Sequence, residues 1–344
     1  MSYSSGSSSS SSLNGPTAGA FRFNTDSSQL EIYDGNQWTG VLATSPNQQT
    51  GGTRAIFSGS YSPMNDAQSY INVDSTGNGI DFGDYVGTDR MSSASAASRT
   101  RGLVMGGYPG SPSTAGLNDI DCNIFSSTGS AFDFGNLSEA VRYAVGGGDA
   151  TRGLRAGGYD GSRSEVIEYV TFAQAGDMVD FGDLSASKFV FINGAVSQTR
   201  SLFPAGGTPG YTNTIEYVTT STLGNAANFG DQTSARGYCM GLASNATRGI
   251  FAGGSDPNAI NVIDYVTIAT LGNAIDFGDL SYAAAGVACC SSSTRGVFGG
   301  GSPSPGRTNI EYVQIMTTGN AVDFGDLSYT ATYATAVSNG HGGL

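Results

Sequence analysis

The chain has very little positive charge and almost no lysine. Its 344 residues include one lysine, Lys188, among 15 basic residues, against 28 acidic residues, which gives a net charge of −13. Nucleic-acid binding needs a basic face that displaces counterions from the phosphates, so we predict no nucleic-acid partner. Only 12% of the residues are charged, about half the usual share. This composition is not typical of a cytosolic metabolic enzyme.

Histidine, cysteine and tryptophan are also scarce. The chain contains one histidine, His341, one tryptophan, Trp38, and four cysteines without C-x-x-C spacing. A structural zinc site needs four soft ligands, and a hydrolase triad needs a positioned base; neither is available. We therefore predict no metal, no cofactor and no enzymatic activity. A glycan-cleaving enzyme built on two carboxylates stays open, because 28 acidic residues give many accidental pairs.

Long apolar runs are absent as well. No window approaches 18 apolar residues, which predicts that no segment spans a membrane. The first residues lack a basic region followed by an apolar one, so we expect no secretory signal. A protein of this kind that acts outside a cell is expected to arrive by another route, such as release of a particle.

What the chain does have is a repeat. A Phe-Gly motif recurs at intervals of 47 to 52 residues, and a Thr-Arg pair keeps step with it. The phenylalanines are Phe82, Phe134, Phe181, Phe229, Phe277 and Phe324, and the arginines are Arg54, Arg101, Arg152, Arg200, Arg248 and Arg295. Self-similarity at a fixed period of this length predicts a repeat architecture.

One repeat contains four short strands and no helix. Residues 247–254, 262–268, 274–277 and 283–289 are apolar or β-branched and are separated by Gly-rich turns, which is typical of a blade of a β-propeller. The fourth stretch consists of small residues, which suit the crowded strand next to the axis. Six copies predict six four-stranded blades, with the phenylalanines between adjacent blades. The spare C-terminal strand at residues 331–337 is expected to join the first blade and close the ring.

The order of these marks resembles a known family. A Gly-Gly pair ends the second strand and a tyrosine lies in the third, at Tyr70, Tyr169, Tyr217, Tyr265 and Tyr312, with Cys122 in the second copy. This arrangement is similar to the kelch family of propellers, and it implies that fold. The outer strand departs from the family, because phenylalanine stands where kelch repeats usually carry tryptophan.

The repeat arginines are predicted to be structural. An acidic residue recurs before the Tyr/Cys position, and we expect each arginine to bond to this residue or to a carbonyl group of its own blade. The acidic residues are Asp121, Glu168, Glu216, Asp264 and Glu311. Two alternatives stay open: the arginines line a pocket for an anionic sugar, or the Asp-Phe-Gly-Asp frames bind calcium, although turn chemistry explains Asp and Gly there.

Binding is predicted in the loops between the second and third strands, where the copies differ most. Variable loops on a rigid scaffold are where binding usually sits. The candidate residues are Tyr61, Tyr108, Tyr159 and Tyr211. Exposed tyrosine rings suit a host surface glycan or protein; the alternative, that these loops are only connections, stays open.

The chain before the repeats divides into three parts. Residues 1–15 form a Ser-rich tail expected to be flexible, residues 16–42 a β-hairpin with a short third strand, and residues 43–52 a polar linker. The propeller follows at residues 53–344. The hairpin has a large apolar load for its size, which predicts anchoring or oligomerisation. The residues concerned are Phe21, Phe23, Leu30, Ile32, Tyr33 and Trp38.

The hairpin also resembles a known module. Residues 19–26 and 30–38 are similar to a short segment that recurs near the N-terminus of virion proteins of tailed bacteriophages, especially fibre-type ones. The resemblance implies a virion location, attachment to other virion proteins through this module, and a homo-oligomer. The expected function is therefore a fibre or adsorption appendage that displays a propeller for host attachment and receptor binding. An extracellular or cell-surface carbohydrate-binding propeller of bacterial origin stays open as the alternative.

Overall fold

The computed structural model describes residues 16–24, 29–40, 52–111, 113, 115–188, 192–204, 206–207, 210–237, 241–303 and 306–344. Every regular element among them is a β-strand. The chain divides into two compact units, residues 1–48 and 49–344, and the division falls inside the predicted linker. The expected tail at residues 1–15 lies outside the described residues, as does nearly all of the linker.

The first unit contains a three-stranded antiparallel sheet. Its strands are β1 (Phe21–Asn24), β2 (Gln29–Tyr33) and β3 (Trp38–Gly40), in the order β1-β2-β3. A hairpin with a short third strand is what the alternating pattern predicted. Asp34 closes the second turn, where its carboxylate accepts hydrogen bonds from the backbone N–H groups of Asn36 and Gln37 at 2.7 and 2.8 Å.

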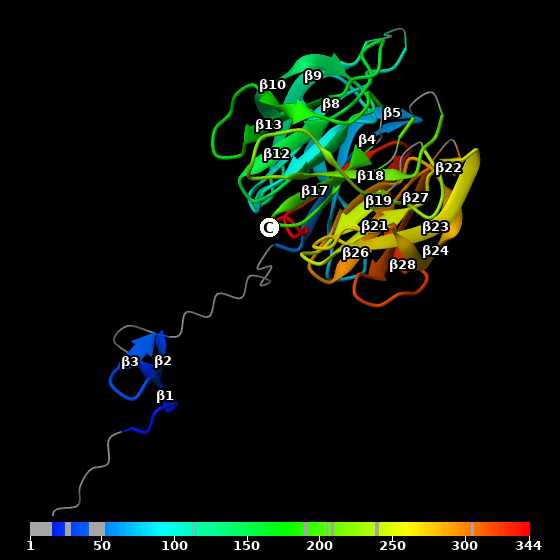
Figure 1. The fold of residues 1–344 in the computed structure, drawn as a ribbon. Helices are drawn as coiled ribbons and strands as arrows, with labels where there is room; N and C mark the ends of the chain where they lie inside the picture. The colour runs from blue at the N-terminus through cyan, green and yellow to red at the C-terminus, as the bar shows by residue number, and fades with distance from the viewer. Residues whose placement is uncertain are drawn as a thin grey trace, which may run out of the picture. The chain divides into compact units, whose positions relative to one another are not determined.

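The second unit is all-β and propeller-like (Figure 1). Its described residues form six sheets, each built on four antiparallel strands, and we number them along the chain. Sheet 1 contains β29 (Thr335–Ser338), β4 (Arg54–Tyr61), β5 (Met64–Asn72) and β6 (Ile80–Asp84). Sheet 2 contains β7 (Ala94–Ala97), β8 (Arg101–Gly107), β9 (Leu117–Ile124) and β10 (Phe132–Val141). Sheet 3 contains β11 (Val145–Gly148), β12 (Arg152–Ala156), β13 (Val166–Thr171) and β14 (Val179–Asp183), with β15 (Ile192–Asn193) parallel to β11.

The later sheets repeat this order. Sheet 4 contains β16 (Ala195–Val196), β17 (Arg200–Phe203), β18 (Thr214–Thr219) and β19 (Ala227–Asp231). Sheet 5 contains β20 (Gly241–Ser244), β21 (Arg248–Ala252), β23 (Asn258–Thr267) and β24 (Ile275–Ala284), with the short β22 (Ser255–Asp256) beside β23. Sheet 6 contains β25 (Ala288–Ser291), β26 (Arg295–Gly299), β27 (Arg307–Gln314) and β28 (Val322–Ala331).

The small-residue strands are the first strand of each sheet. β29, β7 and β25 are buried along their whole length, and β29 contacts β7 on one side and β25 on the other. β29 pairs antiparallel with β4, Val337 opposite Ile56. A strand from the end of the chain therefore belongs to the sheet that begins the second unit, as the sequence predicted, but it covers Thr335–Ser338 and not residues 331–337. Two predicted strand bounds were wrong in this repeat. The strand expected at 274–277 is β24, which continues past the Phe-Gly motif to Ala284 through a register shift, and the small-residue strand expected at 283–289 is β25, at Ala288–Ser291.

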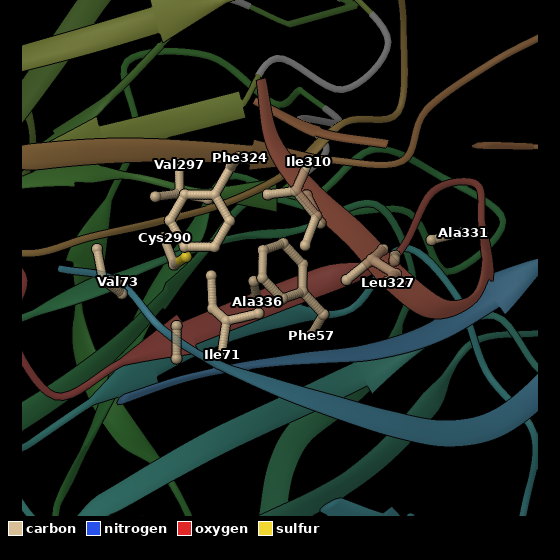
Figure 2. Packing of buried hydrophobic residues seen from close by; sticks show 13 residues of the cluster. Phe57, Ile71, Val73, Cys290, Val297, Ile310, Phe324, Leu327, Ala331 and Ala336 are labelled. Carbon is tan, nitrogen blue, oxygen red and sulfur yellow. The ribbon is translucent and has the colours of Figure 1, made fainter. Parts of the chain in front are cut away.

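The apolar core lies between consecutive sheets. Each of six buried clusters takes side chains from two neighbouring sheets, and each contains one of the repeat phenylalanines. Figure 2 shows the cluster between sheets 6 and 1, in which Phe324 and Ile310 pack with Phe57 and Ile71. The prediction that these phenylalanines fill the space between adjacent sheets is confirmed. Cys289 and Cys290 are buried in the clusters on either side of sheet 6, because successive side chains of a strand point to opposite faces.

The backbone explains why glycine follows each phenylalanine. The carbonyl oxygen of Phe82 accepts a hydrogen bond of 2.7 Å from the N–H of Gly129 in the next sheet. Gly83 has φ +141°, and a Cβ atom there would lie 2.6 Å from the carbonyl carbon of Gly129. The same bond joins each pair of sheets: Gly176 to Phe134, Gly224 to Phe181, Gly272 to Phe229, Gly319 to Phe277 and Gly77 to Phe324. The Phe-Gly motif therefore joins the backbones of neighbouring sheets. We call the contact between two neighbouring sheets a seam.

Candidate functional site

Each of the six repeat arginines forms a hydrogen bond across the contact between its own sheet and the next sheet. The guanidinium of Arg248 lies 4.4 Å from the ring centroid of Tyr265 in its own sheet, and its Nη1 donates to the carbonyl oxygen of Ile315 in the next sheet at 3.1 Å. The other five arginines donate in the same way, Arg54 to Phe125, Arg101 to Phe172, Arg152 to Thr220, Arg200 to Ile268 and Arg295 to Val73. The structural role was predicted, but the expected partner within the same blade was wrong.

The acidic residues expected beside these arginines have other partners. Asp264 pairs with Arg236 at 2.6 Å, and both side chains are fully buried. The other pairs are Asp121 with Arg90, Glu168 with Arg155, and Glu216 with Lys188, whereas Glu311 accepts from Ser281. Arg90, Lys188 and Arg236 each lie before the first strand of a sheet, whereas Arg155 lies in β12. The shared period of the arginines and the acidic residues therefore did not predict which residues pair.

Burial shifts the pKa values of these pairs. Desolvation raises the pKa of Asp121 although Arg90 opposes it, and desolvation lowers the pKa of the Arg236 guanidinium. Burial also acts to raise the pKa of Glu216, but the Lys188 ammonium and hydrogen bonds from Lys188 and Ser185 outweigh it and hold that pKa below its usual value. These ion pairs are buried scaffold and do not form an accessible site.

The predicted binding loops lie at the end of the strands opposite the chain entry. Gly52, the first described residue of the second unit, lies against Asn339 and Gly340, next to the Arg54 end of β4. Tyr61 is at the other end of β4, about 23 Å away at 3.3 Å per residue. We call the face that carries Tyr61 the loop face. A binding site there points away from the side at which the chain enters.

Three of the four predicted tyrosines come together on the loop face. Tyr61 and Tyr108 both line a hollow of about 320 Å³ and an adjoining one of about 630 Å³. Tyr159 has its ring centroid 5.3 Å from the guanidinium of Arg142, which lines the first hollow. Tyr211 lines neither of these two hollows; its ring lies against Gly237. The predicted loops thus contribute unequally.

The first hollow is built largely of tyrosine. Tyr61, Tyr108, Tyr143 and Tyr333 line it with Arg142. The ring centroids of Tyr61 and Tyr333 are 6.1 Å apart at a steep angle, and Arg142 lies 4.5 Å from the centroid of Tyr108 and 5.1 Å from that of Tyr143. Such a surface offers ring faces, hydroxyl groups and a cation within one small volume.

Sequence reasoning missed Arg142, Tyr143 and Tyr333 as site residues. All three precede the first strand of a sheet, in stretches that were expected to contain small residues. The available signal was Arg142, a large cation that stands where other copies have Met91, Ala285 or Thr332. Tyrosine nine residues after the Phe-Gly phenylalanine recurs in three copies, at Tyr143, Tyr238 and Tyr333. A break in a repeat is where a single site is expected, and the break at Arg142 was passed over.

The first unit carries a separate candidate surface. Cross-strand pairing places Phe21 opposite Ile32 and Phe23 opposite Leu30, so these four residues share one face. Phe21, Phe23 and Leu30 are 64%, 63% and 44% exposed. We call these four residues the apolar face of the first unit. One sheet of this size does not bury them.

The two remaining predicted anchoring residues lie on the other face of that sheet. Tyr33 and Trp38 are a cross-strand pair with ring centroids 5.4 Å apart. Arg22 lies over Trp38 at 4.4 Å and pairs with Glu31 at 2.7 Å. The structure therefore divides the predicted anchoring set into an apolar face and an aromatic-charged face.

Within the described part of the chain, no three His, Cys, Asp or Glu side chains gather as a metal-binding group. Among the same residues, no helix is both long and apolar enough to cross a membrane. No protein-family model matches the chain, and no curated protein matches it. A functional conclusion must therefore come from the surfaces just described.

Proposed function

We propose that this chain is a structural virion protein of a tailed bacteriophage, a fibre-type or adsorption appendage that attaches through its N-terminal module and presents a propeller to the host surface. The observation that carries the proposal is that the two units have different candidate interaction surfaces. One unit has an apolar face that its own sheet leaves exposed. The other has a tyrosine-rich hollow at the end of its strands opposite the chain entry.

The propeller in this proposal has six blades and a closed ring. Three contacts support closure. β29 pairs with β4, the Phe324 cluster joins sheets 6 and 1, and Arg295 donates to Val73. Closure suits a displayed domain, because it removes the sheet edges that otherwise template aggregation.

The module in this proposal docks through its apolar face, either with copies of itself or with other virion proteins. Exposed apolar patches rimmed by polar groups mark interaction surfaces. Arg22 and Glu31, on the opposite face of the sheet, satisfy each other's charge. Burial of the apolar face therefore leaves no charge unpaired.

The test is electron microscopy of particles purified from the source culture, with a gold-labelled antibody raised against residues 52–344. We expect label at a fixed place on the virion. Label on bacterial surfaces with none on particles would support the carbohydrate-binding propeller of bacterial origin and contradict the proposal. A chain with Phe21→Ser and Phe23→Ser, added in trans to particles that lack the protein, is expected not to attach, whereas the Thr39→Ser control attaches normally.

A further inference from the structure

Arg142 is a cation without an anion. The described residues provide neither an ion pair nor a hydrogen-bond acceptor for its guanidinium, and its Nε is shielded from solvent without a partner. The buried arginines Arg90, Arg155 and Arg236 all pair with carboxylates. A guanidinium carries five N–H donors; only the Nε of Arg142 is shielded from solvent, so the four donors on its Nη atoms remain available to an acceptor in the hollow. In a chain of net charge −13, the unused donors of Arg142 indicate an external acceptor.

The rings around Arg142 hold it in place. Tyr108, Tyr143 and Tyr159 surround the guanidinium with centroid distances of 4.5, 5.1 and 5.3 Å. The Arg142 backbone also bonds to Tyr159 in both directions, at 3.1 and 2.8 Å. The guanidinium is thus positioned before a ligand arrives, which lowers the ordering cost of binding.

The wall of the hollow is held in a costly backbone conformation. Ser92, Tyr143 and Tyr333 have φ of 53°, 63° and 55°, a left-handed region that is uncommon for side-chain-bearing residues. A chain of backbone hydrogen bonds links them across three sheets, Ser92 to Tyr333 at 2.8 Å and Tyr143 to Ser92 at 3.1 Å. Gly286 has the same conformation, with φ of 70°, so the turn belongs to the repeat; the tyrosines at Tyr143 and Tyr333 carry a backbone cost there that glycine avoids.

The dimensions fit one ring of a sugar. A hollow of about 320 Å³ is at the small end of the range of about 300 to 1,000 Å³ for ligand pockets. The adjoining hollow shares Tyr61 and Tyr108 and contains Asp89, whose carboxylate accepts hydrogen bonds from hydroxyl groups. A chain of linked sugar units extends naturally from the first hollow into the second.

We propose that the first hollow binds the carboxylate of an acidic sugar unit in a surface polysaccharide. The planar fork of Arg142 pairs with the two carboxylate oxygens. The rings of Tyr61, Tyr108 and Tyr333 cover the sugar ring and exclude water. This inference rests on the proposed function of the loop face as a host-binding surface, and it names the chemistry of the receptor.

The experiment is a titration of the full chain by calorimetry and saturation-transfer NMR. The probes are galacturonate and N-acetylneuraminate, with galactose as the neutral control and inorganic phosphate as the anion control. We expect at least one acidic sugar to bind at least tenfold more tightly than galactose and phosphate. Equal binding of phosphate identifies a simple anion site, and equal binding of galactose removes the role of the carboxylate; either result overturns the proposal, as does the absence of binding by both acidic sugars.

Two variants separate the roles of charge and fold. Arg142→Gln is expected to lose at least tenfold in affinity for the acidic sugar. Arg307→Gln, which removes a guanidinium that lies 4.1 Å over Tyr282, is expected to bind as the wild type does. Unchanged affinity in Arg142→Gln overturns the proposal.

If Arg142→Gln fails to fold, the salt dependence of the wild-type chain decides. Affinity for the acidic sugar should fall between about 0.05 M and about 0.5 M salt because screening weakens the charge pair, and constant affinity counts against it. Virion labelling is independent of these titrations. Label without sugar binding removes only this inference, and sugar binding without label removes only the virion assignment.

Discussion

Arg295 donates a hydrogen bond of 3.2 Å from Nη1 to the carbonyl oxygen of Val73, a residue 222 positions earlier in the chain. The bond is the same in kind as the one that Arg248 makes to Ile315 between sheets 5 and 6. The seam between the last and the first sheet therefore uses the contacts of an internal seam.

If the ring is closed, the contact between sheets 6 and 1 should contribute as much to the free energy of unfolding as a contact between two consecutive sheets. Phe324→Ala at the seam between sheets 6 and 1 and Phe277→Ala at the seam between sheets 5 and 6 remove equally buried rings. We expect each to lower the free energy of unfolding by about 3 to 5 kcal/mol, measured by denaturant titration. A loss in Phe324→Ala of less than half that in Phe277→Ala would indicate an open arrangement.

The Phe-Gly glycines should resist substitution more than turn glycines of equal backbone angle. Gly83 and Gly129 have φ of +141° and +142°, but only Gly83 has backbone in the path of a Cβ atom. Gly129→Ala is expected to cost about 1 to 3 kcal/mol from backbone strain. Gly83→Ala should cost at least about 1 kcal/mol more, because the sheets must separate. Thermal unfolding of the two variants provides the comparison, and equal losses would mean that the seam is not closely packed there.

The Arg236–Asp264 pair should be costly to break but not to replace. Arg236→Met leaves the buried carboxylate of Asp264 without its partner, which is expected to lower the free energy of unfolding by about 3 to 5 kcal/mol. The double variant Arg236→Met with Asp264→Leu should recover most of this loss, since no charge then remains buried. Chemical denaturation of both variants tests the expectation. A single variant within about 1 kcal/mol of wild type would contradict it.

His341 should make the fold sensitive to mild acid. Its Nε2 lies 2.7 Å from the carbonyl oxygen of Ala97, and its Nδ1 accepts a bond of 3.1 Å from the N–H of Gly343. The neutral ring satisfies both contacts, whereas a proton on Nδ1 would face an N–H donor. Burial lowers the pKa of His341 from 6.5 to about 4.

The sign of the effect follows from these two values. Between pH 6.5 and about 4 the unfolded chain binds a proton that the folded chain does not, so stability is full above pH 6.5 and falls as the pH decreases. The loss attributable to this residue reaches at most about 3 kcal/mol. Unfolding measured at several pH values should show this slope in the wild type and a smaller slope in His341→Gln. Equal slopes would show that the imidazole is not the group responsible.

The apolar face of the first unit should control assembly. In the full chain, Phe21→Ser with Phe23→Ser removes two large exposed rings, so we expect the mass measured by light scattering to fall to that of one chain. The wild type and the Thr39→Ser control should remain oligomeric. A wild-type chain that is monomeric at all concentrations would remove the homo-oligomer from the proposal and leave docking to other virion proteins.

Local pattern predicted the repeat well. Phe277 and Tyr265 recur at a fixed period, and their positions gave the strands, the small-residue first strand and the buried rings, because each depends on neighbours within about 50 residues. The hydrogen-bond and ion-pair partners of the repeat residues were harder to predict from the sequence. Arg248 and Asp264 recur in step and carry opposite charges, yet each bonds elsewhere, because a bond across a seam depends on how sheets stack.

The sequence by itself determined an all-β chain of six alike units behind a separate three-stranded module, since side-chain periodicity and turn residues act locally. Only the tertiary structure decided that the repeat arginines cross the seams and that Arg142 stands among tyrosines without a carboxylate. The reason is physical: Tyr108, Arg142 and Tyr333 are distant along the chain, and only the packing of sheets 1, 2 and 3 against one another brings them to one hollow.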